Sequence, residues 1–131
     1  MLTLYRNSLA VGLSTTGALE TFAITSQDAT AAANIPWNFS LTKKSSGIVD
    51  DDYTGIVTFD MIDGAGLTTW YVDDGTSHFN TLSSGNHYTY LDSHDGVWQF
   101  QAVFDTAGVK QLVVTALGVT ALVFYSPNVT A

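Results

Sequence analysis

The chain has 131 residues, a formal net charge of −8 with only 4 Lys and Arg residues, and 0 Cys. Hydrophobic residues make up 46% of the chain, which is enough apolar material for one packed core. Because there are so few cations, we expect no nucleic-acid partner and no attraction to an anionic membrane surface. The lack of Cys excludes disulfides, cysteine–zinc sites and thiol catalysis.

Residues 1–18 stand apart from the rest of the chain in their pattern. Arg6 is their only cation and no long apolar run follows it, so they do not have the features of a signal peptide. No run in the chain approaches the roughly 20 apolar residues of a membrane span, so we expect no membrane insertion. We predict an N-terminal assembly arm that pairs with a sheet edge of a neighbouring chain. A small hairpin around Arg6 is the alternative. The apolar arm residues are Leu2, Leu4, Tyr5, Leu9, Val11 and Leu13.

From Leu19 onward, apolar and polar residues alternate with the period of two that is typical of half-buried strands. The alternation predicts strands over 20–26, 36–44, 53–63, 68–72, 96–104, 110–117 and 119–126. The last of these is apolar on both faces, so its inward face is not determined. Glycine-containing turn signals separate most of the runs. About seven short strands with this punctuation predict an all-β, antiparallel β-sandwich over residues 19–131.

Three segments resemble bacterial immunoglobulin-like repeats of the Big type. "FAITSQDATAAANIPWNFSLTKK" is similar to their opening, "DDYTGIVTFDMID" to a "Y-T-G-x-V-x-F" strand, and "DSHDGVWQFQAVFDTAGVKQLVVTALG" to their ending. The resemblance covers about Leu19 to Tyr125. It departs from the pattern at 33–35, where Ala-Gly-Thr is usual, and at 71–90, which is longer. The resemblance implies an immunoglobulin-like fold and a modular, non-catalytic scaffold, as in surface proteins, adhesins and phage virion proteins.

Asp105 lies in "FDTAGV", which is similar to the Asp-Thr-Gly of aspartic proteases. That chemistry needs a tight turn around the carboxylate and a second such Asp to share the proton. Here Ala107 separates Thr106 from Gly108, and no second Asp-Thr-Gly or Asp-Ser-Gly occurs in the chain. We therefore interpret residues 105–108 as a turn between two strands, and we expect no enzyme activity and no catalytic residue.

Acidic loops and histidines are the candidates for a metal site. Calcium prefers oxygen ligands, and consecutive Asp50, Asp51 and Asp52 are the best candidates, although no segment matches a D-x-D-x-D-G loop. Solvated acidic loops are the alternative, so calcium is the one cofactor that we consider. His78, His87 and His94 have no metal-ligand spacing, and we expect them to lie on loop surfaces.

An aromatic-rich stretch between Trp70 and His94 is the candidate for ligand binding. Trp70, Tyr71, Tyr88 and Tyr90 lie among small polar residues, as in many surfaces that bind sugars or proteins. The alternative is that these rings fill one end of the sandwich.

The sequence predicts a structural protein that acts through contacts. We expect a virion subunit, such as a phage capsid decoration or tail-associated protein, whose partners are other copies of itself or a larger assembly on the virion surface. One alternative is a carbohydrate-binding or host-binding adhesin module at the cell surface, with a host glycan as partner. The other is an extracellular filament subunit that is assembled by strand complementation.

Overall fold

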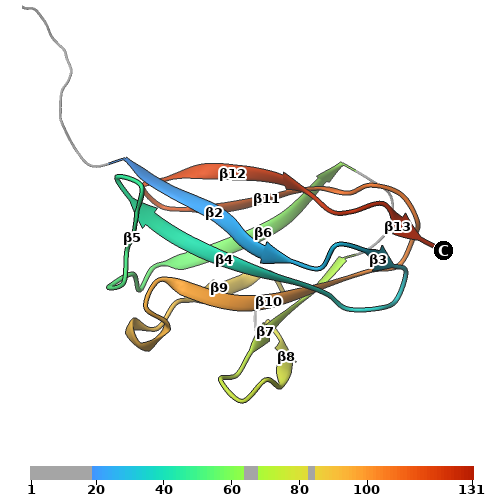
Figure 1. The fold of residues 1–131 in the computed structure, drawn as a ribbon, viewed down its shortest axis with the longest axis horizontal. Helices are drawn as coiled ribbons and strands as arrows, with labels where there is room; N and C mark the ends of the chain where they lie inside the picture. The colour runs from blue at the N-terminus through green and yellow to red at the C-terminus, as the bar shows by residue number, and fades with distance from the viewer. Residues whose placement is uncertain (1–18, 64–67, 83–84) are drawn as a thin grey trace, which may run out of the picture.

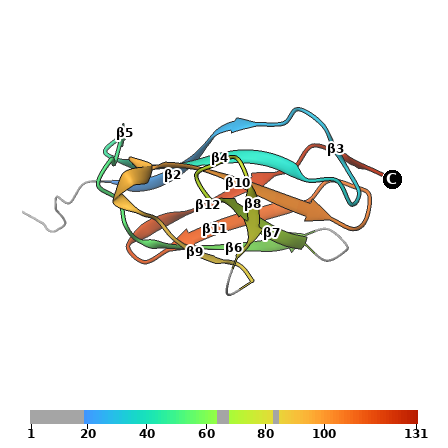
Figure 2. The same ribbon diagram turned by 90° about the horizontal axis from the view of Figure 1, so that it is seen from below.

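Two antiparallel sheets pack face to face in the computed structural model, which describes residues 19–63, 68–82 and 85–131 (Figures 1 and 2). Within these residues, a six-stranded sheet has the order β2-β4-β10-β7-β8, with β5 also paired to β4. Its strands are β2 (Glu20–Gln27), β4 (Trp37–Ser45), β5 (Ile48–Val49), β7 (Thr68–Asp73), β8 (Phe79–Thr81) and β10 (Val97–Phe104).

The second sheet has four described strands in the order β12-β11-β6-β9. They are β6 (Ile56–Asp63), β9 (His87–Thr89), β11 (Gln111–Ala116) and β12 (Val119–Tyr125). The long strands follow the order of an immunoglobulin constant-type sandwich: β2-β4-β10-β7 corresponds to one sheet and β12-β11-β6 to the other. The predicted fold class, an immunoglobulin-like β-sandwich, is confirmed.

The core lies between the two sheets and is built by the period-two alternation of the long strands. Trp37, Phe39 and Leu41 of β4 are buried, and they face buried Phe59 of β6 and Phe124 of β12. This packing also shows which face of β12 points into the core, a question that the sequence leaves open. Leu122 and Phe124 turn inward, and Val123 and Tyr125 are exposed on the outer face.

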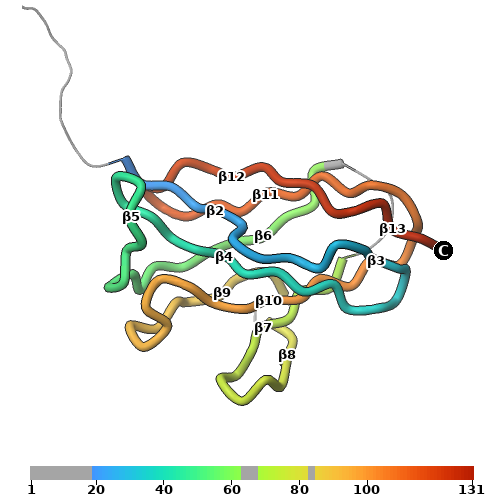
Figure 3. Tube along the Cα trace, viewed as in Figure 1, coloured from blue at the N-terminus to red at the C-terminus, as the bar shows by residue number. Residues whose placement is uncertain are grey.

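Two segments from opposite ends of the described chain close one end of the sandwich. β3 (Ala31–Ala32) pairs in parallel with β13 (Val129–Thr130) (Figure 3). Gly108 forms an antiparallel bridge with Val129. β2 begins at the opposite end of the long axis from the C terminus (Figure 1). The described chain therefore enters at one end of the molecule and leaves at the other.

Helical structure in the described part of the chain is limited to a 3-10 turn, Asp92–His94. The described residues contain no helix that is long and apolar enough to cross a membrane.

Candidate functional site

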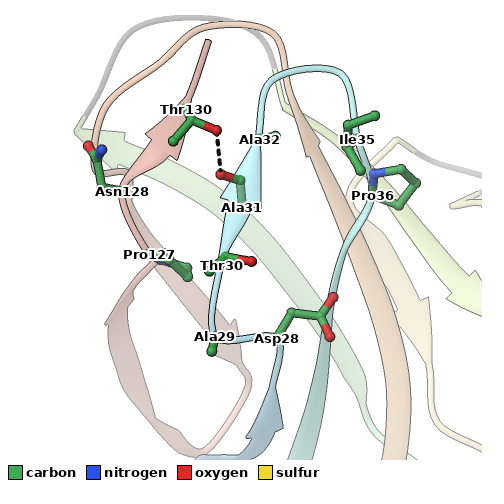
Figure 4. A pocket seen from close by; sticks show the side chains of 10 residues that line it. All are labelled: Asp28, Ala29, Thr30, Ala31, Ala32, Ile35, Pro36, Pro127, Asn128 and Thr130. Atoms are coloured by element: carbon green, nitrogen blue, oxygen red, sulfur yellow. Dashed lines mark hydrogen bonds between the residues drawn. The ribbon is translucent and has the colours of Figure 1, made fainter.

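An open depression lies at the end of the molecule where β3 meets β13 (Figure 4). Its volume is about 790 Å³, and its wall is formed by the links that flank β3 together with the segment after β12. Thr130 Oγ1 donates a hydrogen bond to the carbonyl of Ala31 (3.3 Å), which ties the two strands together across the wall. The lining residues are Asp28, Ala29, Thr30, Ala31, Ala32, Ile35, Pro36, Pro127, Asn128 and Thr130.

The described lining of this depression has few ionisable groups. Asp28 is its only ionisable lining residue, and its carboxylate accepts hydrogen bonds from the backbone N–H and the side-chain amide of Asn38 (3.0 and 2.7 Å). Those bonds fix the carboxylate on the neighbouring strand. Ile35 is exposed beside Pro36, so the rim of the depression includes an exposed apolar side chain.

A buried ion cluster lies at the opposite end, where β2, β4 and the segment after β5 meet. Lys43 is 2% exposed, and its Nζ lies 2.6 Å from Glu20 Oε1 and 3.0 Å from Asp50 Oδ2. Ser45 Oγ donates to the other oxygen of Glu20 (2.8 Å), and the Lys43 ammonium lies 5.0 Å from the centre of the Tyr53 ring.

The two carboxylates keep Lys43 charged. Burial lowers the pKa of this ammonium, but its hydrogen bonds to Glu20 and Asp50 outweigh burial and raise the pKa above its ordinary value. A nucleophilic or base lysine needs the opposite shift. We conclude that the cluster joins three segments of the fold.

An aromatic cluster with one histidine lies next to the 3-10 turn. His94 stacks on Trp98 with ring centroids 3.6 Å apart, and its Nε2 lies 2.6 Å from the Tyr88 hydroxyl. The other ring nitrogen, Nδ1, is buried without a hydrogen-bond partner in the described residues. Our expectation of a surface histidine is wrong for His94, because stacking between Tyr88 and Trp98 buries the ring. His78 and His87 are exposed.

The burial of His94 predicts a loss of stability in mild acid. Burial lowers the pKa of His94, and the negative charge of Asp73 opposes this shift only partly. The unfolded chain therefore binds a proton at higher pH than the folded one, so stability falls as the pH drops through the ordinary value of 6.5. In His94→Gln, we expect the free energy of unfolding to depend less on pH below this value, as measured by urea titration at several pH values. The matched change His78→Gln at an exposed position is expected to leave it intact, and an unchanged pH profile in His94→Gln would contradict the assignment.

The predicted ligand-binding aromatics are not gathered on one surface. Trp70 and Tyr90 are 4% and 1% exposed, and the Tyr90 hydroxyl donates to the carbonyl of Leu41 (2.6 Å). These two rings pack in the core, as the alternative interpretation holds. Tyr71 and Tyr88 are half-buried, and Tyr88 contacts His94. Trp70 also forms part of the wall of a small depression of about 280 Å³ beside Met61.

The predicted calcium candidates diverge in the structure. Asp50 turns toward Lys43, whereas Asp51 and Asp52 are exposed in the turn that follows β5. In residues 19–63, 68–82 and 85–131, no group of three or more His, Cys, Asp or Glu side chains could hold a metal ion.

Asp105 lies in a bend directly after β10 and is exposed. The next residues wrap around a second buried lysine, which the sequence interpretation missed. The Nζ of Lys110 donates to Thr106 Oγ1 (2.8 Å) and to the carbonyl of Ala107 (3.0 Å). The segment is the corner between β10 and β11, as we interpreted it.

The predicted arm residues, from Leu2 to Leu13, lie outside the described residues.

No protein-family model and no curated protein matches this sequence. Solved structures do match its fold. A conjugative transposon lipoprotein from Bacteroides eggerthii is 15% identical with a TM-score of 0.51, over 83% of this chain and 97% of that one. Domains 4 and 5 of the S-layer protein SbsC are 18% identical with a TM-score of 0.56, over 99% of this chain and 57% of that one.

A glycosyl hydrolase family 2 member from Bacteroides cellulosilyticus is 11% identical with a TM-score of 0.58. The match covers 89% of this chain but only 15% of the hydrolase, so it corresponds to one domain-sized part of a large enzyme. At these identities the likeness concerns the fold alone. The chain is thus similar in fold to bacterial β-sandwich domains that occur in proteins of very different kinds.

Proposed function

We propose that this protein is a non-catalytic structural module that takes part in a cell-surface or extracellular assembly through protein–protein contacts. Its partners in this proposal are other copies of itself or a larger surface structure. The depression at the β3–β13 end could contact a partner, and the ion cluster around Lys43 holds the fold together. The charged groups at both places form hydrogen bonds or ion pairs within the domain.

One observation carries the proposal: a neutral, apolar edge on a strongly acidic molecule. The net charge is −8, yet no charged residue occurs between Gln111 and Ala131, the segment that holds β11, β12 and β13. On the outer face of the four-stranded sheet, Val123 and Tyr125 of β12 are exposed, whereas β6 carries the exposed Asp60 on the same face. Charge repulsion between acidic surfaces is weakest along this edge, and apolar burial is available there.

The cell surface is the location we favour within this proposal. Support for this location comes from two proteins of similar fold, which are a lipoprotein and an S-layer protein. A phage capsid decoration or tail-associated subunit would use the same kind of contact. Nothing in the fold distinguishes it, and no virion protein is among the similar structures described above.

An adhesin module that binds a host glycan is the second form of the proposal. Exposed aromatic faces are what sugars stack on, and half-buried Tyr71 on β7 is the predicted binding residue best placed for this. Loss of glycan-array binding in Tyr71→Ala would support this form.

Salt resistance of the assembly tests the proposal. We expect the full chain to be found in the surface fraction of the cells that make it, and to stay there when the salt concentration is raised. Apolar contacts persist in salt, whereas ionic contacts are screened. Release by salt would point to the acidic faces instead. Absence of the protein from the surface fraction would contradict the proposal itself.

A further inference from the structure

Among the residues that the structure describes, β12 forms an unpaired edge of the four-stranded sheet. Its one partner strand in the described part of the chain is β11. It runs for seven residues, Val119–Tyr125, which is about 23 Å at 3.3 Å per residue. β2 of the other sheet lies beside it and runs in the same direction (Figure 1). Such an edge presents a row of backbone groups to another strand.

The register identifies which groups of β12 face outward. Ser126 N–H donates to the carbonyl of Lys110 (2.9 Å), and the pairs that follow are Tyr125 with Gln111 and Val123 with Val113. In an antiparallel ladder, hydrogen-bonded and non-hydrogen-bonded pairs alternate. The backbone N–H and C=O groups of Val123 and Tyr125 therefore point to the free edge, while their side chains are exposed on the outer face.

The other described edges carry the features that block strand addition. β8 and β9 have only three residues each. β2 begins with Glu20 and has an irregular register between Ile24 and Ser26. β12 contains no charge and no proline, and its register with β11 is regular from Leu122 to Tyr125. Short strands, charges and bulges protect sheet edges, and β12 lacks all three over this stretch.

The N-terminal segment of this chain has the matching chemistry. Residues 2–13 contain apolar side chains at alternating positions, such as Leu9, Val11 and Leu13, and no acidic residue. Arg6 gives the segment a positive charge opposite an acidic domain. Residues 2–13 are also long enough, when extended, to cover the whole of β12.

A second copy is the source of this segment that the geometry favours. The carbonyl of Leu19 accepts a hydrogen bond from Ser46 N–H (2.8 Å), so the ladder between β2 and β4 extends to the first described residue. The chain thus meets the domain in line with β2. To reach β12 of its own domain, the preceding segment would have to reverse and cross to the other sheet.

We infer that the free edge of β12 accepts residues 2–13 of a second copy as an added strand. This inference rests on the proposed contact function, for which it names the acceptor edge and the partner. Each copy carries one donor segment and one acceptor edge, so copies can join head to tail in open chains or rings, or exchange their segments reciprocally in a two-fold dimer.

Two single-defect variants of the full chain test this inference. Val123→Pro removes an outward N–H from the edge but no hydrogen bond to β11. This variant keeps its donor segment and has a defective acceptor edge, so we call it donor-only. The acceptor-only variant keeps its length and carries serine in place of Leu2, Leu4, Leu9, Val11 and Leu13. In sedimentation experiments, we expect wild type to associate with rising concentration, and each variant alone to associate at least about tenfold more weakly. A mixture of the two variants is expected to form one-to-one complexes that grow no further.

The controls separate the edge from the outer face and from misfolding. Val123→Lys replaces the proline variant if the latter unfolds, and Ile62→Lys is its match, because the two side chains are 46% and 55% exposed on the same face. We expect only the Val123 change to reduce association. Wild type that stays monomeric, a serine variant that associates like wild type, an unreactive mixture, or equal loss in Ile62→Lys would each overturn the inference. A monomeric wild type that resists salt in the surface fraction would leave the proposed function standing.

Discussion

Replacing Lys43 with Met is expected to lower the free energy of unfolding by about 3 kcal/mol, because it removes the cation between two carboxylates. Removing one partner of a buried ion pair leaves the other charge uncompensated. Glu20 and Asp50 retain about a third of their exposure, at 31% and 28%, so water keeps the loss at the lower end of the usual range. Urea unfolding at neutral pH measures this change.

Lys44 is the matched control, since it is the next residue on the same strand and has no ion pair among the described residues. Lys44→Met is expected to change stability by less than about 0.5 kcal/mol. Equal effects of the two substitutions would show that the ion cluster does not hold β2 and β5 to β4.

Acid should weaken the same cluster. Hydrogen bonds from Lys43 and Ser45 lower the pKa of Glu20 below its ordinary value of 4.5. The stabilisation is therefore complete above that value and is lost as the pH falls through the lowered pKa of the folded protein. The difference in stability between wild type and Lys43→Met should shrink over this range, and a constant difference would contradict the assignment.

Substituting Gly96 with Ala is the second change with a large expected effect, a loss of about 3 kcal/mol. Gly96 has φ +78°, and a Cβ there would clash with the backbone carbonyl of Asp50. The carbonyl of Gly96 also accepts the backbone N–H of Lys43 (2.8 Å), so the turn cannot move away without breaking that bond. Left-handed strain contributes about 1 to 2 kcal/mol, and the clash contributes a similar amount.

Gly118→Ala separates the two contributions. Gly118 has φ +74°, and no atom lies within 4 Å of the place that a Cβ would occupy, so only the strain should appear. Thermal unfolding of both variants should show the larger decrease in Gly96→Ala. Equal decreases would mean that the 94–96 turn is not pressed against Asp50.

Alternation predicted the sheets well because it depends mainly on one physical effect, the burial of apolar side chains between two layers. In the run 36–44, the period of two predicts Trp37, Phe39 and Leu41 on one face, and all three are buried. The corner at Asp105 was also predictable, because its Asp, Thr and Gly residues favour a turn and the next apolar run begins directly after it.

Buried polar residues were the part that sequence did not predict. Lys43 follows Trp37, Phe39 and Leu41 at the same spacing of two, so the alternation itself places it inward. A lysine is buried only when anions reach it, and Glu20 and Asp50 come from other strands. The burial of His94 is likewise not predictable from the sequence. It depends on Tyr88 and Trp98, which only the fold brings beside the ring.

The inward face of β12 also required the structure, because Leu122 and Val123 are equally apolar. The register with β11 decides it, and the same register leaves Val123 and Tyr125 with outward backbone groups. An apolar residue on the outer face of an edge strand is thus the sequence signal for the proposed contact. This signal can be recognised only when the structure shows that β12 is an edge strand.

Residue-resolved amide exchange of the full chain, at low and high protein concentration, tests this contact most directly. The outward N–H groups of Val123 and Tyr125 have no partner strand in the described part of the monomer, and an added strand would accept them. We predict that both amides exchange more slowly at high concentration. Unchanged exchange at these two positions, with slowing confined to the depression between Asp28 and Pro36, would contradict it.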